Sequence, residues 1–146
     1  CMAEAILFEA GNQPLAGKVA VGEVILNRVK STKYPNTVCG VVHQGPLSSW
    51  WKRKYNKDVP VRNRCQFSYW CDGKSDSVTR WVKTHTWREV LRATLYVMST
   101  KNNVDGSLKE FSLTDGATHY HATYVNPHWN KFLEKTVRIQ DHIFYK

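Results

Sequence analysis

The feature that most constrains this fold is the N-terminal stretch, in which two apolar segments flank a short polar break. Residues 5–8 are apolar and lead directly into Glu9, and Gly11 follows two positions later. After the break, apolar residues recur at helical spacing and cover more than one stripe. The pattern predicts a helix over residues 2–10 that stops at Gly11. It also predicts a central helix over residues 13–30 that is buried on much of its surface.

Glu9 is a carboxylate on a helix face that is otherwise apolar. It lies one turn after Ala5 and Ile6, so it should turn inward with them. Two roles fit such a group: a structural carboxylate paired with an arginine or a buried amide, or an acid whose pKa desolvation raises above about 4.3. We expect desolvation to outweigh the cations of the chain unless Arg28 or a lysine contacts Glu9 directly.

Length and charge narrow the class of protein. The 146 residues predict one domain over residues 1–146, and the net charge of +9 favours a polyanionic partner. Nucleic acid, an anionic membrane surface and an acidic cell-wall polymer all fit, as does a merely solvated basic surface. No apolar run is long enough to span a membrane, and no signal peptide is recognisable. Because the chain begins with Cys rather than Met, we expect that an upstream segment has been removed.

The four cysteines form an even set, Cys1, Cys39, Cys65 and Cys71, without the C-x-x-C spacing of a zinc ribbon. Cys65 and Cys71 are close enough in sequence to close a short loop, which leaves Cys1 with Cys39. Two disulfides in an oxidising compartment are one interpretation. Four reduced thiols in the core are the other.

The rest of the chain contains one long irregular region. Thr37 is placed to cap a short helix that ends at Val42. Residues 43–77 are irregular, basic and aromatic, and we interpret them as the wall of a groove, since long loops in small domains are often functional. Further along, the pattern predicts a helix over residues 86–99, a turn over residues 102–106, and extended segments over residues 113–121 and 137–145.

A pair of histidines raises the question of a metal. In a strand, His119 and His121 share a face and could hold a metal together with His142, His128 or His85. No acidic ligand accompanies them in sequence. We therefore favour polar groups lining a groove, or core histidines, and we expect no metal and no other cofactor.

Aromatic and basic residues alternate over residues 50–55, and basic residues recur at 62–64. Such a surface could bind single-stranded nucleic acid by stacking and charge. It could equally stack on sugar rings, or the tryptophans could pack under loops. No G-x-S-x-G elbow and no glycine-rich phosphate loop is present, and no spacing favours a Cys–His nucleophile.

Four blocks, in order along the chain, match one family pattern. They are residues 9–29, which contain a variant of an E-A-R-G-E box and a V-I-L-N-R-V stretch, and then residues 34–42, 65–73 and 117–145. On these blocks the chain resembles the bacterial and phage cell-wall hydrolases of the spore-cortex-lytic enzyme type. The resemblance implies a lysozyme-like α+β fold, mainly helical with a small β-element. It also implies cleavage of the bond between N-acetylmuramic acid and N-acetylglucosamine in peptidoglycan.

In the family that the chain resembles, the first glutamate of the box is the catalytic acid, and the resemblance therefore implies this role for Glu9. The box departs from the pattern afterwards, because Gly11-Asn12-Gln13 stands where Arg-Gly-Glu is usual, so that Gln13 replaces a second carboxylate. This departure fits a lytic transglycosylase, in which one residue protonates the glycosidic oxygen and then deprotonates the muramic 6-hydroxyl, giving a 1,6-anhydro end.

Other mechanisms and roles stay open. A hydrolytic muramidase would need water and a second carboxylate, for which Asp72 and Asp115 are candidates. A metal-dependent amidase or peptidase and a non-catalytic basic module for cell wall or nucleic acid are remoter alternatives. Arg28 is expected to pair with an internal carboxylate. Substrate-binding roles are expected for Gln66, Ser68, His119, Tyr120, His121 and Trp129.

The expected partners are the glycan strands of peptidoglycan and an anionic cell-wall polymer, and no nucleic acid. We expect a monomer that acts at the cell wall or in the periplasm, either exported or delivered by a phage lysis system.

Overall fold

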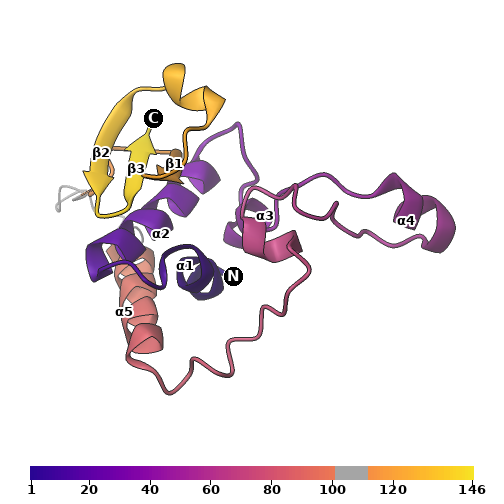
Figure 1. Cartoon of the computed structure of the whole chain (residues 1–146), viewed down its shortest axis with the longest axis horizontal. Coiled ribbons are helices and arrows are strands. Elements are labelled where there is room, and N and C mark those ends of the chain that lie inside the picture. The colour runs from indigo at the N-terminus through magenta and orange to yellow at the C-terminus, as the bar shows by residue number, and fades with distance from the viewer. Residues whose placement is uncertain (101–111) are drawn as a thin grey trace.

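The computed structural model describes residues 1–100 and 112–146. The α-helices in this part of the chain are α1 (Met2–Ala10), α2 (Leu15–Lys30), α3 (Val38–Val42), α4 (Ser49–Tyr55) and α5 (His85–Thr100). The 3-10 helices are η1 (Ser68–Cys71) and η2 (His128–Lys131), and the strands are β1 (His119–Ala122), β2 (Lys135–Ile139) and β3 (His142–Tyr145). Helix α2 lies at the centre, and α1, α3, α5 and the sheet pack against it (Figure 1).

Helix α2 is buried along most of its length, as the sequence predicts. Its close packing depends on Gly22, because a Cβ at that position would lie 3.0 Å from Cγ2 of Val97 on α5 and 3.3 Å from Cδ1 of Ile6 on α1. The glycine therefore lets three helices meet at one point. The helix begins at Leu15, two residues later than predicted, because Pro14 adopts extended backbone and serves as the N-cap.

The other helix predictions fare unevenly. Helices α1 and α5 occur where they are predicted, and the Thr37 hydroxyl caps α3 by accepting a hydrogen bond from the Gly40 amide at 3.0 Å. The irregular description of residues 43–77 is wrong in two places, since α4 and η1 form there. Helix α4 has no buried residue, so no apolar periodicity marks it in the sequence.

The three strands form one antiparallel sheet in the order β1-β3-β2. The predicted extended segment over residues 137–145 is in fact a hairpin of β2 and β3, which turns at Gln140 with a positive φ of 50°. The predicted segment over residues 113–121 is extended only in its last part, where β1 begins at His119. Turns with positive φ account for both differences, at Gln140 in the later segment and at Asp115 and Gly116 in the earlier one. The predicted turn over residues 102–106 lies outside the described residues.

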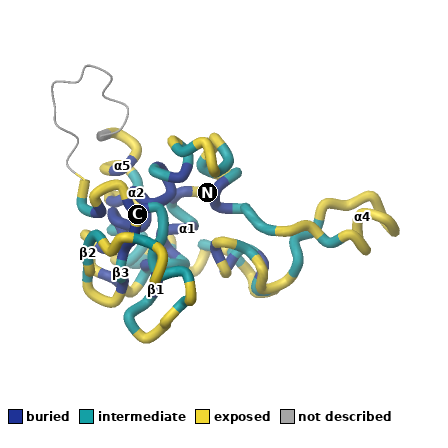
Figure 2. The backbone as a smooth tube through the Cα atoms, turned by 90° about the horizontal axis from the view of Figure 1, so that it is seen from above, coloured by how far each residue is buried: buried dark blue, intermediate teal, exposed yellow. Residues whose placement is uncertain are grey.

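Two apolar clusters share α2. The larger joins α1, α2, α3 and α5, and the smaller joins Ala20 and Val24 of α2 to Ala117 and Phe144 beneath the sheet. Figure 2 shows the buried residues gathered around α2, with exposed residues over α4 and the rim of the sheet. No helix within residues 1–100 and 112–146 is both long enough and apolar enough to cross a bilayer.

Two disulfides fasten the N-terminal half. Cys1 is bonded to Cys39 with a Cα–Cα distance of 5.3 Å, and Cys65 is bonded to Cys71 with a Cα–Cα distance of 6.1 Å. The disulfide interpretation of the four cysteines is therefore confirmed, with the pairing that the spacing suggested. The first bond ties the start of α1 to α3, and the second closes the loop around η1.

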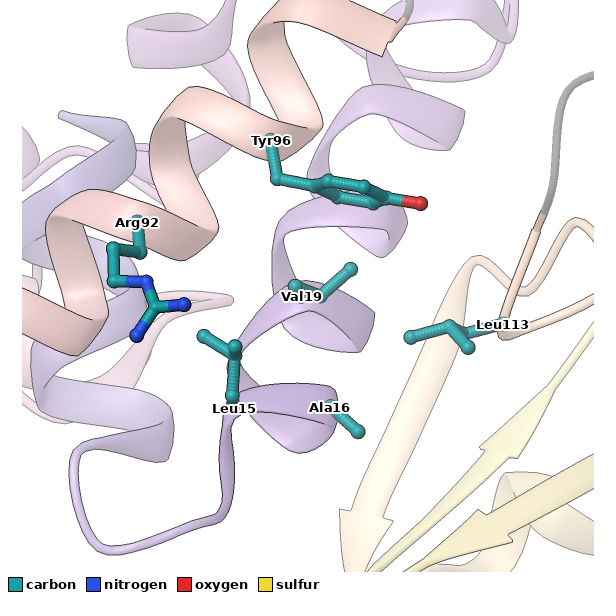
Figure 3. Close-up of a pocket in the computed structure, with 6 residues that line it drawn as sticks. All are labelled: Leu15, Ala16, Val19, Arg92, Tyr96 and Leu113. Carbon is teal, nitrogen blue, oxygen red and sulfur yellow. The ribbon is translucent and has the colours of Figure 1, made fainter. Parts of the chain in front are cut away.

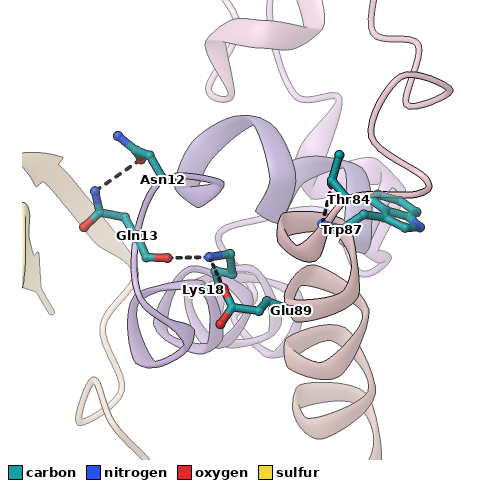
Figure 4. A network of polar contacts seen from close by, with 6 residues as sticks. All are labelled: Asn12, Gln13, Lys18, Thr84, Trp87 and Glu89. Carbon is teal, nitrogen blue, oxygen red and sulfur yellow. Dashed lines mark hydrogen bonds and ion pairs between the residues drawn. The ribbon is translucent and has the colours of Figure 1, made fainter.

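A buried lysine joins α2 to α5. Lys18 is 1% exposed, and its ammonium group lies 3.0 Å from Oε2 of Glu89 and donates to the carbonyl of Gln13 (Figure 4). The same view shows Thr84, whose hydroxyl accepts a hydrogen bond from the Trp87 amide at 3.2 Å in the first turn of α5. A buried charge with two polar partners fixes the relative position of the two helices, because leaving it unpaired would be costly.

Candidate active site

A cavity of about 380 Å³ lies between α1, α2, β1 and the loop around η1. Its lining contains Glu9 and every residue for which the sequence predicted a substrate-binding role, together with four others. The lining residues are Glu9, Arg28, Gln66, Phe67, Ser68, His119, Tyr120, His121, Ala122, Val125 and Trp129. The structure thus brings together residues that are more than 100 positions apart in the sequence, while their roles stay predictions.

Glu9 and Tyr120 are the central pair of this cavity. The phenol of Tyr120 donates a hydrogen bond of 2.7 Å to Oε2 of Glu9. Burial raises the pKa of Glu9 above its usual value, while the hydrogen bond from Tyr120 and the charge of Arg28 act in the opposite direction. The expectation that desolvation dominates at Glu9 is therefore confirmed. The carboxyl keeps its proton to a higher pH than an exposed glutamate does.

The position of Tyr120 follows from the sheet register. Tyr120 pairs with Phe144 across β1 and β3, and its ring lies 5.1 Å from the ring of His142 and 5.6 Å from that of Phe144. Burial, followed by the proximity of Glu9, raises the pKa of Tyr120 well above its usual value. The phenol therefore stays protonated and remains a donor to Glu9.

Arg28 lines the cavity but forms no ion pair within the described residues, so the expected pairing with an internal carboxylate is wrong. Its Nε donates to the carbonyl of Thr118 at 2.7 Å, and its guanidinium lies 5.2 Å from the ring centre of Tyr34 and 5.5 Å from that of Phe67. Ring faces and a carbonyl thus take the place of a carboxylate. The cation influences Glu9 through space rather than by contact.

His119 and His121 share one face of β1, as predicted, and both rings contact Trp129, at 5.1 and 5.6 Å between ring centres. Both nitrogens of His121 are engaged, Nδ1 with the carbonyl of Ala122 at 2.8 Å and Nε2 with the hydroxyl of Tyr145 at 3.0 Å. Burial and the charge of Arg28 lower the pKa of His119, which favours its neutral form.

The three histidines considered as a further metal ligand do not join this pair. His142 contacts Tyr120 from within the sheet, His128 contacts Phe132, and His85 lies at the start of α5. No group of three or more His, Cys, Asp or Glu residues with a metal-binding arrangement occurs in the part of the chain that the structure describes.

No second carboxylate lines the cavity among the described residues. Gln13 is 4% exposed and faces the β2–β3 turn, where its Nε2 donates to Oδ2 of Asp141 and its Oε1 accepts from the Asp141 amide, both at 3.2 Å. Asp115 is paired with Lys146 at 2.9 Å, and Asp72 accepts from the Lys74 amide at 2.8 Å. Neither candidate second carboxylate borders the cavity.

The loop around η1 forms the wall opposite β1. Phe67 is 1% exposed, whereas Gln66 and Ser68 on either side of it are exposed and line the cavity. Alternation of this kind follows from extended backbone at Phe67, whose φ is −101° and ψ is 108°. The Cys65–Cys71 disulfide closes this loop. The interpretation of residues 43–77 as a groove wall therefore holds for this part.

Sequence reasoning did not assign four lining residues to the site. Phe67, Ala122 and Val125 adjoin residues that it did assign, and apolar side chains carry no signal that separates a cavity wall from a core. Arg28 was assigned to a buried ion pair instead.

A second pocket, of about 340 Å³, opens between α2 and α5 (Figure 3). The residues around it are largely apolar, with Arg92 and Tyr96 reaching in from α5: Leu15, Ala16, Val19, Arg92, Tyr96 and Leu113. No carboxylate is among its described lining residues, so it offers no acid comparable to Glu9.

The sequence matches the profile of the cell wall hydrolase family over residues 12–145. The chain therefore belongs to the cell wall hydrolase family. The match begins three residues after Glu9 and does not include it, so the role of Glu9 stays a prediction.

Curated relatives of the chain agree with its membership of the cell wall hydrolase family. The chain is 51% identical over 43 residues to a spore cortex-lytic enzyme of Bacillus cereus and 45% identical over 47 residues to one of Bacillus subtilis. These matches cover 30% and 32% of this chain but only 17% and 15% of the relatives.

Two solved structures share the fold. The catalytic domain of the germination-specific lytic transglycosylase SleB from Bacillus anthracis superimposes with a TM-score of 0.56 at 25% identity, covering 99% of this chain and 90% of that domain. The catalytic domain of Bacillus cereus SleB gives a TM-score of 0.55 at 24% identity, covering 99% and 86%. The expected α+β fold, mainly helical with a small sheet, is thus confirmed.

Proposed function

We propose that this chain is a peptidoglycan-lytic enzyme that cleaves the bond between N-acetylmuramic acid and N-acetylglucosamine as a lytic transglycosylase. The observation that carries the proposal is Glu9. Among the described residues it is the one carboxylate that lines the cavity, and burial raises its pKa. A single acid that holds its proton until substrate arrives is what this reaction requires.

The chemistry needs Glu9 twice. Protonated Glu9 donates its proton to the glycosidic oxygen as the bond to C1 of the muramic residue breaks, and N-acetylglucosamine leaves as an alcohol. The resulting carboxylate then accepts the proton of the muramic 6-hydroxyl while O6 bonds to C1. The ring closes as a 1,6-anhydro sugar, no water is consumed, and Glu9 is again protonated.

The neighbouring side chains suit supporting roles. Tyr120 holds the carboxyl of Glu9 in one orientation through its 2.7 Å hydrogen bond. Gln66 and Ser68, exposed on the facing wall, are placed to bind acetamido or hydroxyl groups. Trp129, braced against His119 and His121, offers a ring face to a sugar.

A hydrolytic muramidase is the second candidate, and the geometry favours it less. Glycosidases that use water generally place two carboxyl groups about 5–5.5 Å or about 6.5–9.5 Å apart. The described lining offers no partner for Glu9, and Gln13, at the position of the second box carboxylate, faces Asp141 instead. The lytic transglycosylase name of the Bacillus anthracis neighbour supports the same choice.

The proposal extends to place and partners. Its substrate lies outside the cytoplasm, so we place its action at the cell wall or in the periplasm. We propose that it works as a monomer, and that its net charge of +9 draws it to an anionic cell-wall polymer.

Mass spectrometry of digested peptidoglycan tests the reaction. We expect products with anhydromuramic ends, lighter by one water than muramidase products, and no such products from Glu9→Gln. Glu4→Gln is the matched control, because Glu4 lies on the same helix but does not line the cavity. Reducing ends from the wild-type protein would favour the muramidase, and activity that EDTA abolishes would favour the metal-dependent alternative.

A further inference from the structure

A projecting hairpin, residues 47–60, has no part in the cavity and is here called the arm. It consists of α4 and two flanking segments that pair at its base, where Leu47 and Pro60 form a β-bridge and the Ser48 amide donates to the carbonyl of Val59 at 2.8 Å. Figures 1 and 2 show the arm extending away from the body of the protein. No residue of α4 is buried.

The arm is nevertheless an ordered element. The Ser48 hydroxyl accepts from the Trp51 amide at the start of α4, and Asn56 ends the helix in the left-handed conformation with a φ of 51°. A seven-residue helix is marginal on its own, so two caps and a paired base are needed to hold it. Because α4 buries no residue, it does not contribute to the core, and we look for its role in the side chains that it exposes.

The arm presents a cluster of aromatic rings. Trp50 and Trp51 meet edge to face at 5.0 Å, and Tyr55 lies 5.8 Å from Trp50 and 5.1 Å from Trp51. Trp50 and Tyr55 are each 48% exposed, and Leu47 beside them is 56% exposed. Exposed apolar groups gathered in this way mark a binding surface, because scattered single residues are the usual case.

Cations surround these rings. The arm carries four cations, Lys52, Arg53, Lys54 and Lys57, and the single carboxylate of Asp58. Asp58 pairs with Lys52 at 3.0 Å, and the ammonium of Lys54 lies 5.0 Å from the ring centre of Trp50. Arg53 and Lys57 have no ion pair within residues 1–100 and 112–146. They remain available to an anionic ligand.

We propose that the arm is a second binding site for peptidoglycan, an inference that rests on the proposed function of the cavity. Sugar rings would lie on the faces of Trp50 and Tyr55, and carboxylates of the stem peptides would meet Arg53 and Lys57. The base of the arm is close to the cavity wall in sequence, because Gln66 lies six positions after Pro60, a span of at most about 21 Å. One polymer can therefore reach both sites.

Peptidoglycan fits this surface better than single-stranded nucleic acid does. Successive bases stack on rings that offer consecutive parallel faces. Here Trp50 is perpendicular to Trp51, with an interplanar angle of 90°, and meets Tyr55 at 71°, while Trp51 and Tyr55 are tilted by 36°, so that no two of the three rings are parallel. Separate ring faces at different angles suit separate sugar units, each of which needs only one face.

Sedimentation with insoluble peptidoglycan tests the proposal. All variants carry Glu9→Gln so that the polymer survives, and the peptidoglycan is freed of phosphate-containing polymers with hydrofluoric acid. We expect the aromatic variant Trp50→Ala/Tyr55→Ala and the charge variant Arg53→Ser/Lys57→Ser each to bind about tenfold more weakly or worse. The matched control Lys33→Ser/Lys83→Ser removes the same charge from exposed positions outside the arm and should bind as the parent does.

Equal binding by the parent and both arm variants would overturn the proposal. So would a loss seen only with walls that retain their phosphate polymers, or binding of the parent to single-stranded DNA but not to peptidoglycan. Thermal unfolding should be unchanged in the arm variants, since α4 contributes nothing to the core.

With Glu9 restored, the arm variants should clear whole walls more slowly but cleave a soluble tetrasaccharide fragment at the parent rate. Failure of the proposed function is distinguishable, because the wild-type protein would then give no anhydromuramic products at all. Failure of the arm proposal would leave those products intact.

Discussion

Replacing Tyr120 with Phe should move the pH dependence of the reaction in one direction. The phenol stabilises the ionised form of Glu9, so its hydrogen bond lowers the pKa of that carboxyl against the larger effect of burial. Removing the hydroxyl leaves burial unopposed except by Arg28, and the pKa of Glu9 rises further. A general acid loses activity as pH rises through its pKa, so the alkaline limb of the variant should lie at higher pH.

The size of the shift follows from the bond that is lost. A hydrogen bond to a charged group is worth about 1.5–3 kcal/mol, and one pKa unit corresponds to about 1.36 kcal/mol. The limb should therefore move by about 1–2 pH units. The lower end is the better expectation, because water that enters the space can replace part of the bond.

Initial rates of wall clearing, measured across pH at constant ionic strength, give both limbs. Tyr145→Phe is the control, because this buried phenol bonds to His121 and not to Glu9. If the limb of Tyr120→Phe stays in place or moves to lower pH, the ionisation that limits the reaction does not belong to Glu9 hydrogen-bonded to Tyr120.

Three further predictions concern stability. Because the folded state raises the pKa of Glu9, the stability that its protonated form contributes should be lost as pH rises through that pKa. The measure is the difference in unfolding free energy between the parent and Glu9→Gln, from denaturant titrations between pH 4 and 8, because His43, His119 and His142, whose pKa values burial lowers, titrate in both proteins. This difference should change by the amount that Glu9 contributes, and a difference that does not vary with pH would contradict the reasoning. Glu23→Ala should cost about 3 kcal/mol or more and lower Tm by roughly 6–12 °C in calorimetry, because the carboxylate of Glu23 accepts four hydrogen bonds from residues 112–114. A Tm within 2 °C of the parent would contradict this. Cys39→Ser should lower the free energy of unfolding in urea by about 4 kcal/mol, and Cys65→Ser should lower it by about 2 kcal/mol. The Cys1–Cys39 bond closes the longer loop, because its cysteines are 38 positions apart and those of Cys65–Cys71 are 6 apart. A larger loss in Cys65→Ser than in Cys39→Ser would refute this reasoning.

The elements that the sequence predicts well are those with a buried stripe. Helices α1, α2 and α5 each pack a periodic apolar face, and that face is visible in the sequence. Helix α4 is invisible to this reasoning because it buries nothing. The hairpin of β2 and β3 reads as one strand because the turn at Gln140 is short and polar.

The site divides in the same way. Residues in the family blocks gather around one cavity, as the resemblance implies. The environment of Arg28 could not be predicted, because its partners are a backbone carbonyl and two aromatic rings. Sequence reasoning looks for a charged partner, and none of these partners carries a charge. The hydrogen bonds of Gln13 to Asp141 are equally hidden, because 128 positions separate the two residues.

Glu9 and Tyr120, the central pair of the cavity, are both positioned by α2. Helix α1, which carries Glu9, packs against Gly22 of α2. The side chains of Asn27 and Arg28 on α2 donate hydrogen bonds to the carbonyls of residues 117 and 118, which lead into Tyr120. The loop with Gln66 and Ser68 has its own disulfide instead. If Glu9 donates the proton and this loop binds the substrate, as proposed, substitutions in the loop can change substrate preference without moving Glu9 or Tyr120. Specificity and chemistry could then evolve at different rates.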